Sequence, residues 1–309
     1  MRPARRGLSI GSRRGCAFPH RVLAPPQALI VFNPDAGRRP QSRRRQLDAL
    51  VRALTGRGWR CEVSVARAEA EAASRYDVLI GCGGDGTLHA LAQIAAGGRC
   101  LLGVAPPFGT ANILAHALRC PSRPEAAADW LARAWRLGGK ELPLGVAETA
   151  TVRRYFLAIA SVGYDAAIVA AMGAGAKRRW GKLAFAARAA AAWRRYFPAP
   201  LICDLAPAPL DGLLFSLTRF YGGRLRLGTP APGQPLLLGL RGAPYLLPLQ
   251  ALALASVGLV HAPGVTRFPG HAVAVVTPGR PLQLDGEAYG ATPVRLGLEA
   301  GGIRFLVPQ

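Results

Sequence analysis

The chain has 309 residues, half of them apolar, which is enough for two domains with separate cores. Its formal net charge of +22 favours anionic partners such as nucleotides or the acidic face of a membrane. No apolar stretch of about 20 residues runs without interruption, so a transmembrane helix is not expected. No helix-turn-helix or zinc-finger pattern accompanies the charge, and nucleic acid is therefore the least favoured partner.

Residues 1–26 carry six arginines and no acidic residue, and they end in Pro25-Pro26. They lack the continuous apolar region of a secretory signal, so we expect a basic disordered tail. The six cysteines are scattered without a CxxC pair, which argues against a zinc site and against a disulfide framework. The cytoplasm is the expected location, and peripheral attachment to the inner face of the membrane is left open.

The first half of the chain alternates between strand and helix patterns. Apolar runs predict strands at residues 28–32, 59–65, 76–82 and 101–105. Amphipathic stretches predict helices at residues 42–54, 87–96, 112–118 and 122–137. This alternation predicts a parallel sheet covered on both faces, whose ligands bind beyond the carboxyl ends of the strands. The loops at residues 33–37, 83–87 and 107–112 should therefore converge on one edge.

The pattern changes near residue 141. Short apolar runs predict strands at residues 155–161, 213–220, 236–240, 272–276 and 295–298, and one helical segment covers residues 166–197. We therefore predict an α/β N-terminal domain with a parallel sheet at residues 27–139. A β-rich antiparallel second domain should follow at residues 140–309, and its last strand is left free to return to the first domain.

The pentapeptide Gly83-Gly84-Asp85-Gly86-Thr87 lies between a predicted strand and a predicted helix. Glycines let backbone N–H groups approach a phosphate closely, and the N-terminus of the following helix favours an anion. Asp85 suits a Mg²⁺ shell or a bound nucleotide. An Asp-Gly pair alone is more often a tight turn, but the full motif between strand and helix favours a phosphate site.

This stretch resembles the GGDGT signature of the diacylglycerol kinase catalytic domain family, which includes bacterial lipid kinases and sphingosine and ceramide kinases. A more distant version occurs in NAD kinases. Further motifs follow in the family's order: Asn33-Pro34-Asp35-Ala36-Gly37, the loop from Pro107 to Asn112, Gly163-Tyr164-Asp165-Ala166, the segment from Lys177 to Leu183, and Leu284-Asp285-Gly286-Glu287. The matches span nearly the whole chain, and their order is more specific than any single motif.

The resemblance implies an ATP- and Mg²⁺-dependent kinase that phosphorylates a diacylglycerol-like or sphingoid-like lipid in phospholipid biosynthesis. ATP would be held by Asn33, Pro34, Asp35, Ala36 and Gly37, by Gly83, Gly84, Asp85, Gly86 and Thr87, and by Thr110. Asp85 would also hold Mg²⁺ through water. Asp285 and Glu287 would supply the general base for the lipid hydroxyl, and the sequence leaves open which of the two takes the proton.

Several positions depart from the family pattern. Ala36 stands where the family often has Ser, and Ile113 stands where it often has Asp. No carboxylate follows Tyr221-Gly222-Gly223, so a structural Mg²⁺ site of some relatives is not expected. These losses motivate a hypothesis from another class, a catalytically weakened nucleotide- or lipid-binding protein. An NAD kinase-like enzyme is less favoured, because the Gly163–Ala166 and Asp285–Glu287 elements fit the lipid branch.

Residues 166–203 carry seven basic side chains and no acidic one, with Trp180 and Trp193 near the ends of the helical part. Such a segment suits docking on anionic lipid head groups, although a solvated helix face is the commoner explanation. A homodimer is left open.

Overall fold

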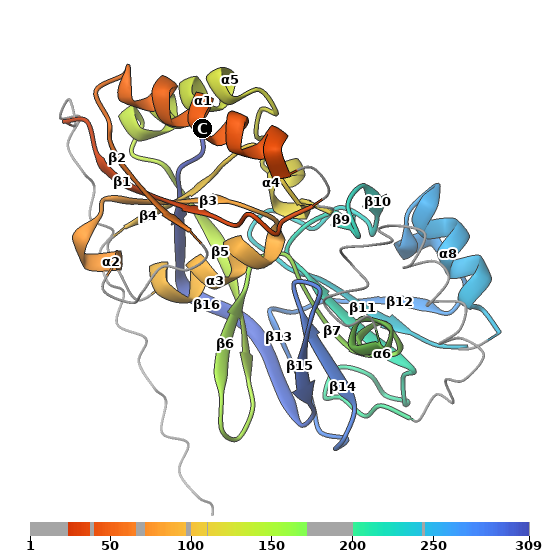
Figure 1. Cartoon of the computed structure of the whole chain (residues 1–309). Helices are drawn as coiled ribbons and strands as arrows, with labels where there is room; N and C mark the ends of the chain where they lie inside the picture. Colours follow the sequence, from red (N-terminus) through yellow and green to blue (C-terminus); the bar gives the residue numbers. More distant parts are fainter. Residues whose placement is uncertain are drawn as a thin grey trace, which may run out of the picture.

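The computed structural model describes residues 24–37, 40–65, 72–96, 100–109, 111–171, 200–242 and 245–308. These residues form two sheets with helices packed around them (Figure 1). The first is a mixed sheet of eight strands that begins at the N-terminus of the described part, and the second is an antiparallel sheet of six strands.

The mixed sheet begins with the four parallel strands β1 (Gln27–Phe32), β2 (Arg60–Val65), β3 (Val78–Cys82) and β4 (Leu101–Val104). Their spatial order is β2-β1-β3-β4. Every residue of β3 and β4 is buried, as the uninterrupted apolar runs require of strands covered on both faces.

Helices cover the two faces of this parallel half. Figure 1 shows α1 (Pro40–Thr55) and α5 (Pro124–Arg136) on one face, where Leu47, Leu50 and Leu131 pack against β1 and β3. The other face carries α3 (Asp85–Ala95), whose Leu88 and Leu91 pack on the same strands. The short helices α2 (Ala72–Arg75) and α4 (Ile113–Ala117) lie in the connections. The loops that follow the strands lie at the carboxyl edge of the sheet.

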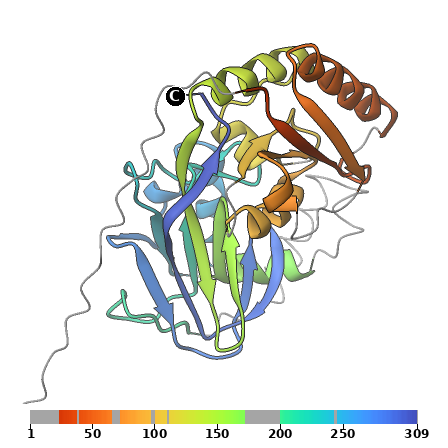
Figure 2. The ribbon, with the colours of Figure 1, turned by 90° about the vertical axis from the view of Figure 1, so that its left-hand side faces the viewer.

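The last strand, β16 (Val294–Phe305), joins the two halves of the molecule. It pairs in parallel with β4 at Phe305 and antiparallel with β5 (Lys140–Glu148) along nearly its whole length. Figure 2 shows β16 in blue beside β5 in yellow-green, both running from one body of the molecule into the other. The strands β6 (Arg153–Phe156) and β13 (Ala272–Val275) extend this side of the sheet.

The second sheet has the order β12-β11-β8-β7-β14-β15, with every neighbouring pair antiparallel. Its strands are β7 (Ile159–Gly163), β8 (Gly212–Ser216), β11 (Leu236–Leu240), β12 (Val265–Phe268), β14 (Pro281–Leu284) and β15 (Glu287–Ala291). The helices α6 (Tyr164–Ala171) and α8 (Leu247–Ala255), the short helix η1 (Leu259–His261) and the small hairpin β9 (Phe220–Tyr221) and β10 (Leu225–Arg226) surround it. The predicted fold class, an α/β domain followed by a β-rich antiparallel domain, is confirmed.

The single strand predicted at residues 155–161 is wrong. The structure divides it into β6 and β7, because the backbone N–H groups of Leu157, Ala158 and Ile159 turn away and donate to the carboxylate of Asp285. The strand predicted at residues 213–220 likewise ends at Ser216. The helix predicted at residues 166–197 begins at Tyr164, and its part beyond residue 171 lies outside the described residues.

Within the described ranges, no helix combines the length and apolar character needed to cross a bilayer. The five described cysteines are all free thiols.

Phe305 tests the role of β16 in stability. Its ring is 1 % exposed and packs in the core beneath α3. We expect Phe305→Ala to lower the free energy of unfolding by about 3–5 kcal/mol, because the cavity cannot be refilled between two paired strands. Urea denaturation monitored by circular dichroism measures this change in the free energy of unfolding. Val152→Ala, at an exposed turn, should change stability by less than about 0.5 kcal/mol; equal effects of the two substitutions would contradict the prediction.

Candidate active site

The loops that follow β1, β3 and β4 lie against one another. The side-chain amide of Asn33 reaches Thr87 Oγ1 at 3.5 Å, and the backbone N–H of Asn33 donates to the carbonyl oxygen of Cys82 at 3.0 Å. A methyl group added to Gly109 would lie 2.5 Å from the Cα atom of Gly84. The structure therefore brings the Asn33–Gly37, Gly83–Thr87 and Pro107–Gly109 segments to one edge of the sheet.

Two glycines of these loops have no room for a side chain. A Cβ atom at Gly83 would lie 2.1 Å from Thr87 Oγ1. Gly37 has φ +71, and a Cβ atom there would lie 2.4 Å from the carbonyl oxygen of Phe108. Gly37 lets backbone approach backbone and Gly83 makes room for the side chain of Thr87, and the loops thereby present N–H groups at the N-terminus of α3.

Asp85, the first residue of α3, caps α4 from outside that helix. Asn112 cannot do so, because its side chain is bonded to both the N–H and the carbonyl oxygen of Gly109. The carboxylate of Asp85 instead accepts the N–H of Leu114 at 3.3 Å. Burial raises the pKa of Asp85 from 3.8 to about 6, although the backbone N–H groups of α4 oppose the shift.

Asp285 and Gly286 form the turn between β14 and β15, with φ +51 and +83. The side chain of Asp285 is 3 % exposed and accepts four hydrogen bonds. Oδ1 accepts the N–H groups of Ala158 and Ile159 at 2.8 and 3.0 Å. Oδ2 accepts the N–H of Leu157 at 2.8 Å and lies 2.9 Å from His89 Nδ1. Its oxygen lone pairs are thereby occupied.

Glu287, two residues further along, is exposed and lies beside the glycine loop. A methyl group added to Gly86 would lie 2.6 Å from Glu287 Oε1. Glu287 therefore reaches from the second sheet to the first turn of α3. The two halves of the predicted site, residues 83–87 and residues 285–287, meet across the junction of the two sheets.

His89 and Gln93 are site residues that the sequence analysis missed. They lie one turn apart on α3, and both face the second half of the molecule. His89 contacts Asp285, while the side-chain amide of Gln93 donates to the carbonyl oxygen of Tyr155 at 2.8 Å and accepts its N–H at 3.1 Å. Polar residues at i and i+4 directly after the glycine loop are the signal that could have found them.

A buried polar cluster ties the Asp285 turn to the Gly163–Ala166 motif. Gln283 accepts the N–H of Gly286 at 2.7 Å and donates to Asp165 at 3.3 Å. Ser161 and Tyr221 also donate to the carboxylate of Asp165. Burial raises the pKa of Asp165, against the effect of these hydrogen bonds. The cluster holds the turn in a fixed position beneath the glycine loop.

Arg43, in the first turns of α1, carries a buried charge beside the Asn33–Gly37 loop. It is 9 % exposed, and its Nη1 has no hydrogen-bond partner. Its Nη2 would lie 2.0 Å from a Cβ atom at Gly37, so the guanidinium points at this loop. Burial lowers the pKa of Arg43, as expected for a cation removed from water. A buried guanidinium with one nitrogen that lacks a hydrogen-bond partner suits an anionic ligand.

The remaining predicted residues differ in how well they are placed. Asp35 is exposed, and its N–H donates to Asn33 Oδ1 at 3.0 Å, an Asx turn that shapes the loop. Ala36 packs against the core beneath α1. Thr110 lies outside the described residues. Ile113 is buried in an apolar cluster with Leu214 and Leu238, so a carboxylate at this position would face hydrocarbon.

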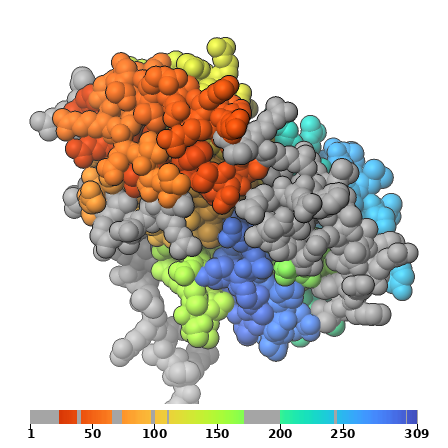
Figure 3. All heavy atoms as spheres, viewed as in Figure 1, coloured from red at the N-terminus to blue at the C-terminus, as the bar shows by residue number. Residues whose placement is uncertain are grey.

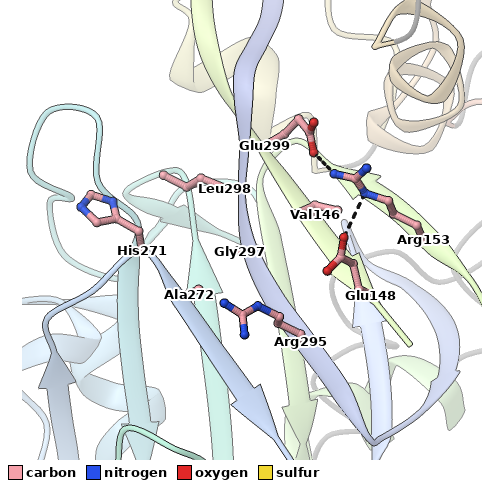
Figure 4. Close-up of a pocket in the computed structure, with 9 residues that line it drawn as sticks. All are labelled: Val146, Glu148, Arg153, His271, Ala272, Arg295, Gly297, Leu298 and Glu299. Atoms are coloured by element: carbon pink, nitrogen blue, oxygen red, sulfur yellow. Dashed lines mark hydrogen bonds and ion pairs between the residues drawn. The ribbon is translucent and has the colours of Figure 1, made fainter. Parts of the chain in front are cut away.

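A hollow of about 370 Å³ lies apart from these loops, on β5, β6, β13 and β16. Figure 4 shows Arg153 bridging Glu148 and Glu299 at one side and Arg295 and His271 at the other. None of the predicted site residues lines it, so this hollow is not part of the candidate active site.

Comparisons with known proteins bear on the family and on the fold. Residues 27–137 match the family described as diacylglycerol kinase catalytic domain. A diacylglycerol kinase from Bacillus anthracis str. Sterne has a similar structure, with a TM-score of 0.61 and 16 % identity. The superposition covers 91 % of this chain and 96 % of that one.

An NAD kinase from Archaeoglobus fulgidus in complex with ATP also matches, with a TM-score of 0.50 and 14 % identity. That comparison covers 92 % of this chain and 94 % of the other. At such identities the structural likeness shows the fold. No curated protein matches the chain.

The raised pKa of Asp85 predicts how stability depends on pH. The folded protein binds the proton of Asp85 more tightly than the unfolded chain, so this carboxyl reduces stability as the pH rises from about 4 through about 6. Asp85→Asn removes this loss and should be more stable than the wild type above pH 6, by roughly 1–3 kcal/mol. Urea denaturation of both proteins between pH 3.5 and 8 measures the difference, at roughly half-unit steps.

The difference between Asp85→Asn and the wild type should shrink towards zero below about pH 4. Asp48→Asn, on the surface of α1, serves as a control and should show no comparable dependence on pH. A difference that stays constant over the whole pH range would contradict the assignment.

Proposed function

We propose that the chain is an ATP-dependent lipid kinase, because residues 27–137 match the family described as diacylglycerol kinase catalytic domain. Its acceptor would be a hydroxyl of a diacylglycerol-like or sphingoid-like lipid. The observation that supports the proposal is the proximity of Gly86 and Glu287, since a carboxylate from the second sheet lies beside the glycine turn that would bind phosphate.

The triphosphate of ATP would bind where the three loops converge. Backbone N–H groups of Gly83–Thr87, at the N-terminus of α3, suit an anion there. The guanidinium of Arg43, whose Nη1 lacks a hydrogen-bond partner, points at the Asn33–Gly37 loop and would be neutralised by a phosphate. Asn33, hydrogen-bonded to Thr87, would fix the distance between the two loops.

Mg²⁺ fits this site as part of a ligand shell that the nucleotide completes. The described residues contain no group of three or more His, Cys, Asp or Glu side chains arranged for a metal. Mg²⁺ in phosphoryl-transfer sites typically uses one or two carboxylates, with waters and phosphate oxygens as its other ligands. Asp85 would supply such a carboxylate, through water, and the ion would neutralise charge on the phosphates.

Glu287 is the better placed of the two carboxylates to take the proton of the lipid hydroxyl. It is exposed, whereas the oxygens of Asp285 already accept four hydrogen bonds. The hydroxyl oxygen would form a bond to the γ-phosphorus while the bond from that phosphorus to the β–γ bridging oxygen breaks. ADP leaves, and the proton of the hydroxyl moves to Glu287. Asp285 is then a positioning residue that holds the turn.

A weakened binding protein is the second candidate, because Ile113 stands in an apolar cluster where the family often has a carboxylate. An NAD kinase-like enzyme is the third. A screen of ATP consumption over diacylglycerol, monoacylglycerol, phosphatidylglycerol, ceramide, sphingosine and NAD separates the three. Lipid-dependent ADP formation that Asp85→Ala abolishes supports the lipid kinase, whereas activity with NAD alone or with no acceptor contradicts it.

The two carboxylates of the turn should respond differently to substitution. We expect Glu287→Gln to lower kcat at least 100-fold at wild-type stability, since general bases contribute about 10²–10⁴-fold. Asp285→Asn should lower the free energy of unfolding as well, by about 1–3 kcal/mol, because an amide cannot accept all four hydrogen bonds. Steady-state kinetics and urea denaturation measure the two effects. Loss of kcat at unchanged stability in Asp285→Asn, with an active Glu287→Gln, would reverse the assignment.

Arg43 should act on nucleotide binding. We expect Arg43→Gln to raise the Kd for ATP about 10-fold or more, because a charge-assisted hydrogen bond to phosphate contributes about 1.5–3 kcal/mol. Isothermal titration calorimetry measures it. Arg45→Gln, an exposed neighbour on the same helix, is the control and should bind ATP as the wild type does. Equal affinities in the two variants would remove Arg43 from the site.

A further inference from the structure

Helix α8 (Leu247–Ala255) has its polar and apolar sides reversed relative to an ordinary surface helix. Its one polar side chain, Gln250, is 4 % exposed and donates to the carbonyl oxygens of Arg241 and Pro263. Leu249 and Leu252, by contrast, are 50 % and 64 % exposed. In a surface helix whose outer face meets only water, the polar side chain would be exposed and the leucines would be buried.

The exposed apolar side chains continue on both flanks of the helix. Tyr245 before it and Val257 after it are also exposed. These four residues, Tyr245, Leu249, Leu252 and Val257, are called the α8 face below. They are four of the ten large hydrophobic side chains that stand exposed among the described residues, although they come from only 13 positions. Such clustering marks an interaction surface.

The α8 face lies at the outer edge of the second sheet (Figure 1). In the space-filling view its segment forms the blue atoms at the right-hand edge of the molecule (Figure 3). The short helix η1, which follows α8, is tied to the small hairpin: Val260 donates its N–H to the carbonyl oxygen of Leu227, and Leu227 donates its own N–H to the carbonyl oxygen of Arg219. The hairpin therefore borders the α8 face.

The stretch of sequence that contains the α8 face carries charged side chains of one sign only. No Asp or Glu occurs between Asp211 and Asp285, a stretch that contains six arginines. Three of them, Arg219, Arg224 and Arg226, are exposed on or beside the β9–β10 hairpin, and none is paired with a carboxylate of the described residues. An apolar face bordered by unpaired cations fits the interface of a bilayer that carries anionic lipids.

We propose that the α8 face docks the protein on a membrane surface containing anionic lipids. Tyr245, Leu249, Leu252 and Val257 enter the interfacial layer, and the arginines of the hairpin contact lipid phosphates. A second copy of the chain fits less well, since a symmetric contact would bring the same arginines together. The docking surface is chemically independent of the kinase site, but it would deliver a lipid acceptor if the proposed function holds.

Contacts within the molecule connect the α8 face to the candidate active site. Ala253, on the buried side of α8, belongs to the same apolar cluster as Ile113, the residue that follows Asn112 at the start of α4. The N-terminal N–H groups of α4 in turn face Asp85. A membrane held at α8 therefore lies next to the packing that supports the catalytic loops.

Sedimentation of the full chain with vesicles, without nucleotide, tests the docking directly. The vesicles contain phosphatidylcholine alone or phosphatidylcholine mixed with phosphatidylglycerol. We expect binding to the mixed vesicles, and we expect Leu249→Gln/Leu252→Gln to weaken it about 10-fold or more. The control Val65→Gln/Leu137→Gln removes two exposed apolar side chains from the first domain and should bind as the wild type does.

The arginines have a separate effect. Arg219→Gln/Arg224→Gln/Arg226→Gln should weaken binding to the mixed vesicles at low salt and make the remaining binding less dependent on salt. Unchanged binding in both the leucine and the arginine variants would overturn the proposal. A change from dimer to monomer in Leu249→Gln/Leu252→Gln, with no vesicle binding by the wild type, would show instead that a second copy covers the face.

The two proposals fail in distinguishable ways. Glu287→Gln should bind vesicles as the wild type does, because Glu287 lies outside the α8 face. Vesicle binding by a chain with no lipid-dependent ATP consumption would remove the proposed function and leave the docking surface intact. Activity on detergent-dispersed lipid that Leu249→Gln/Leu252→Gln does not change, with no vesicle binding by the wild type, would remove the docking surface alone.

Discussion

The carboxylate of Asp285 is the contact on which the arrangement of the two halves depends. It accepts three consecutive backbone N–H groups from the bend between β6 and β7 and contacts His89 on α3. The bend belongs to the chain that leaves the mixed sheet, the turn of Asp285 belongs to the second sheet, and α3 carries the glycine loop. One buried anion thereby sets the position of all three elements.

This arrangement explains why the site can form at all. Parallel strands direct their following loops to one edge, which presents backbone N–H groups together with side chains such as those of Asp85 and Arg43. The second carboxylate has to come from elsewhere, and the hairpin of β14 and β15 brings Glu287 to Gly86. Strand β16 stabilises the relative position of the two halves, because it pairs with both β4 and β5 in the mixed sheet.

The site also concentrates groups whose burial costs free energy. Asp85 and Asp165 both have pKa values raised by burial, and Arg43 has an unpartnered nitrogen. Asp165 is compensated within the protein by Ser161 and Tyr221. Asp85 keeps a raised pKa despite its backbone N–H partners at the start of α4, and Arg43 has a nitrogen without a hydrogen-bond partner. Both lie at the loops to which the proposed function assigns the nucleotide. Such uncompensated charges are typical of sites that a ligand completes.

The sequence by itself determined the alternation of strands and helices in the first half, the fold class and the loops that meet, because apolar periodicity and glycine turns are local properties of the chain. It also supplied the motifs that place Asp85, Asp285 and Glu287 together. Tertiary structure alone decided which of the two carboxylates of the turn is exposed (Glu287) and which is hydrogen-bonded (Asp285). The saturation of Asp285 depends on N–H groups of residues 157–159, more than 120 positions earlier in the chain, and that break in the predicted strand has no local signal. Arg43 and α8 likewise have no local signal, because the burial of Arg43 and the exposure of the α8 leucines arise only in the folded protein.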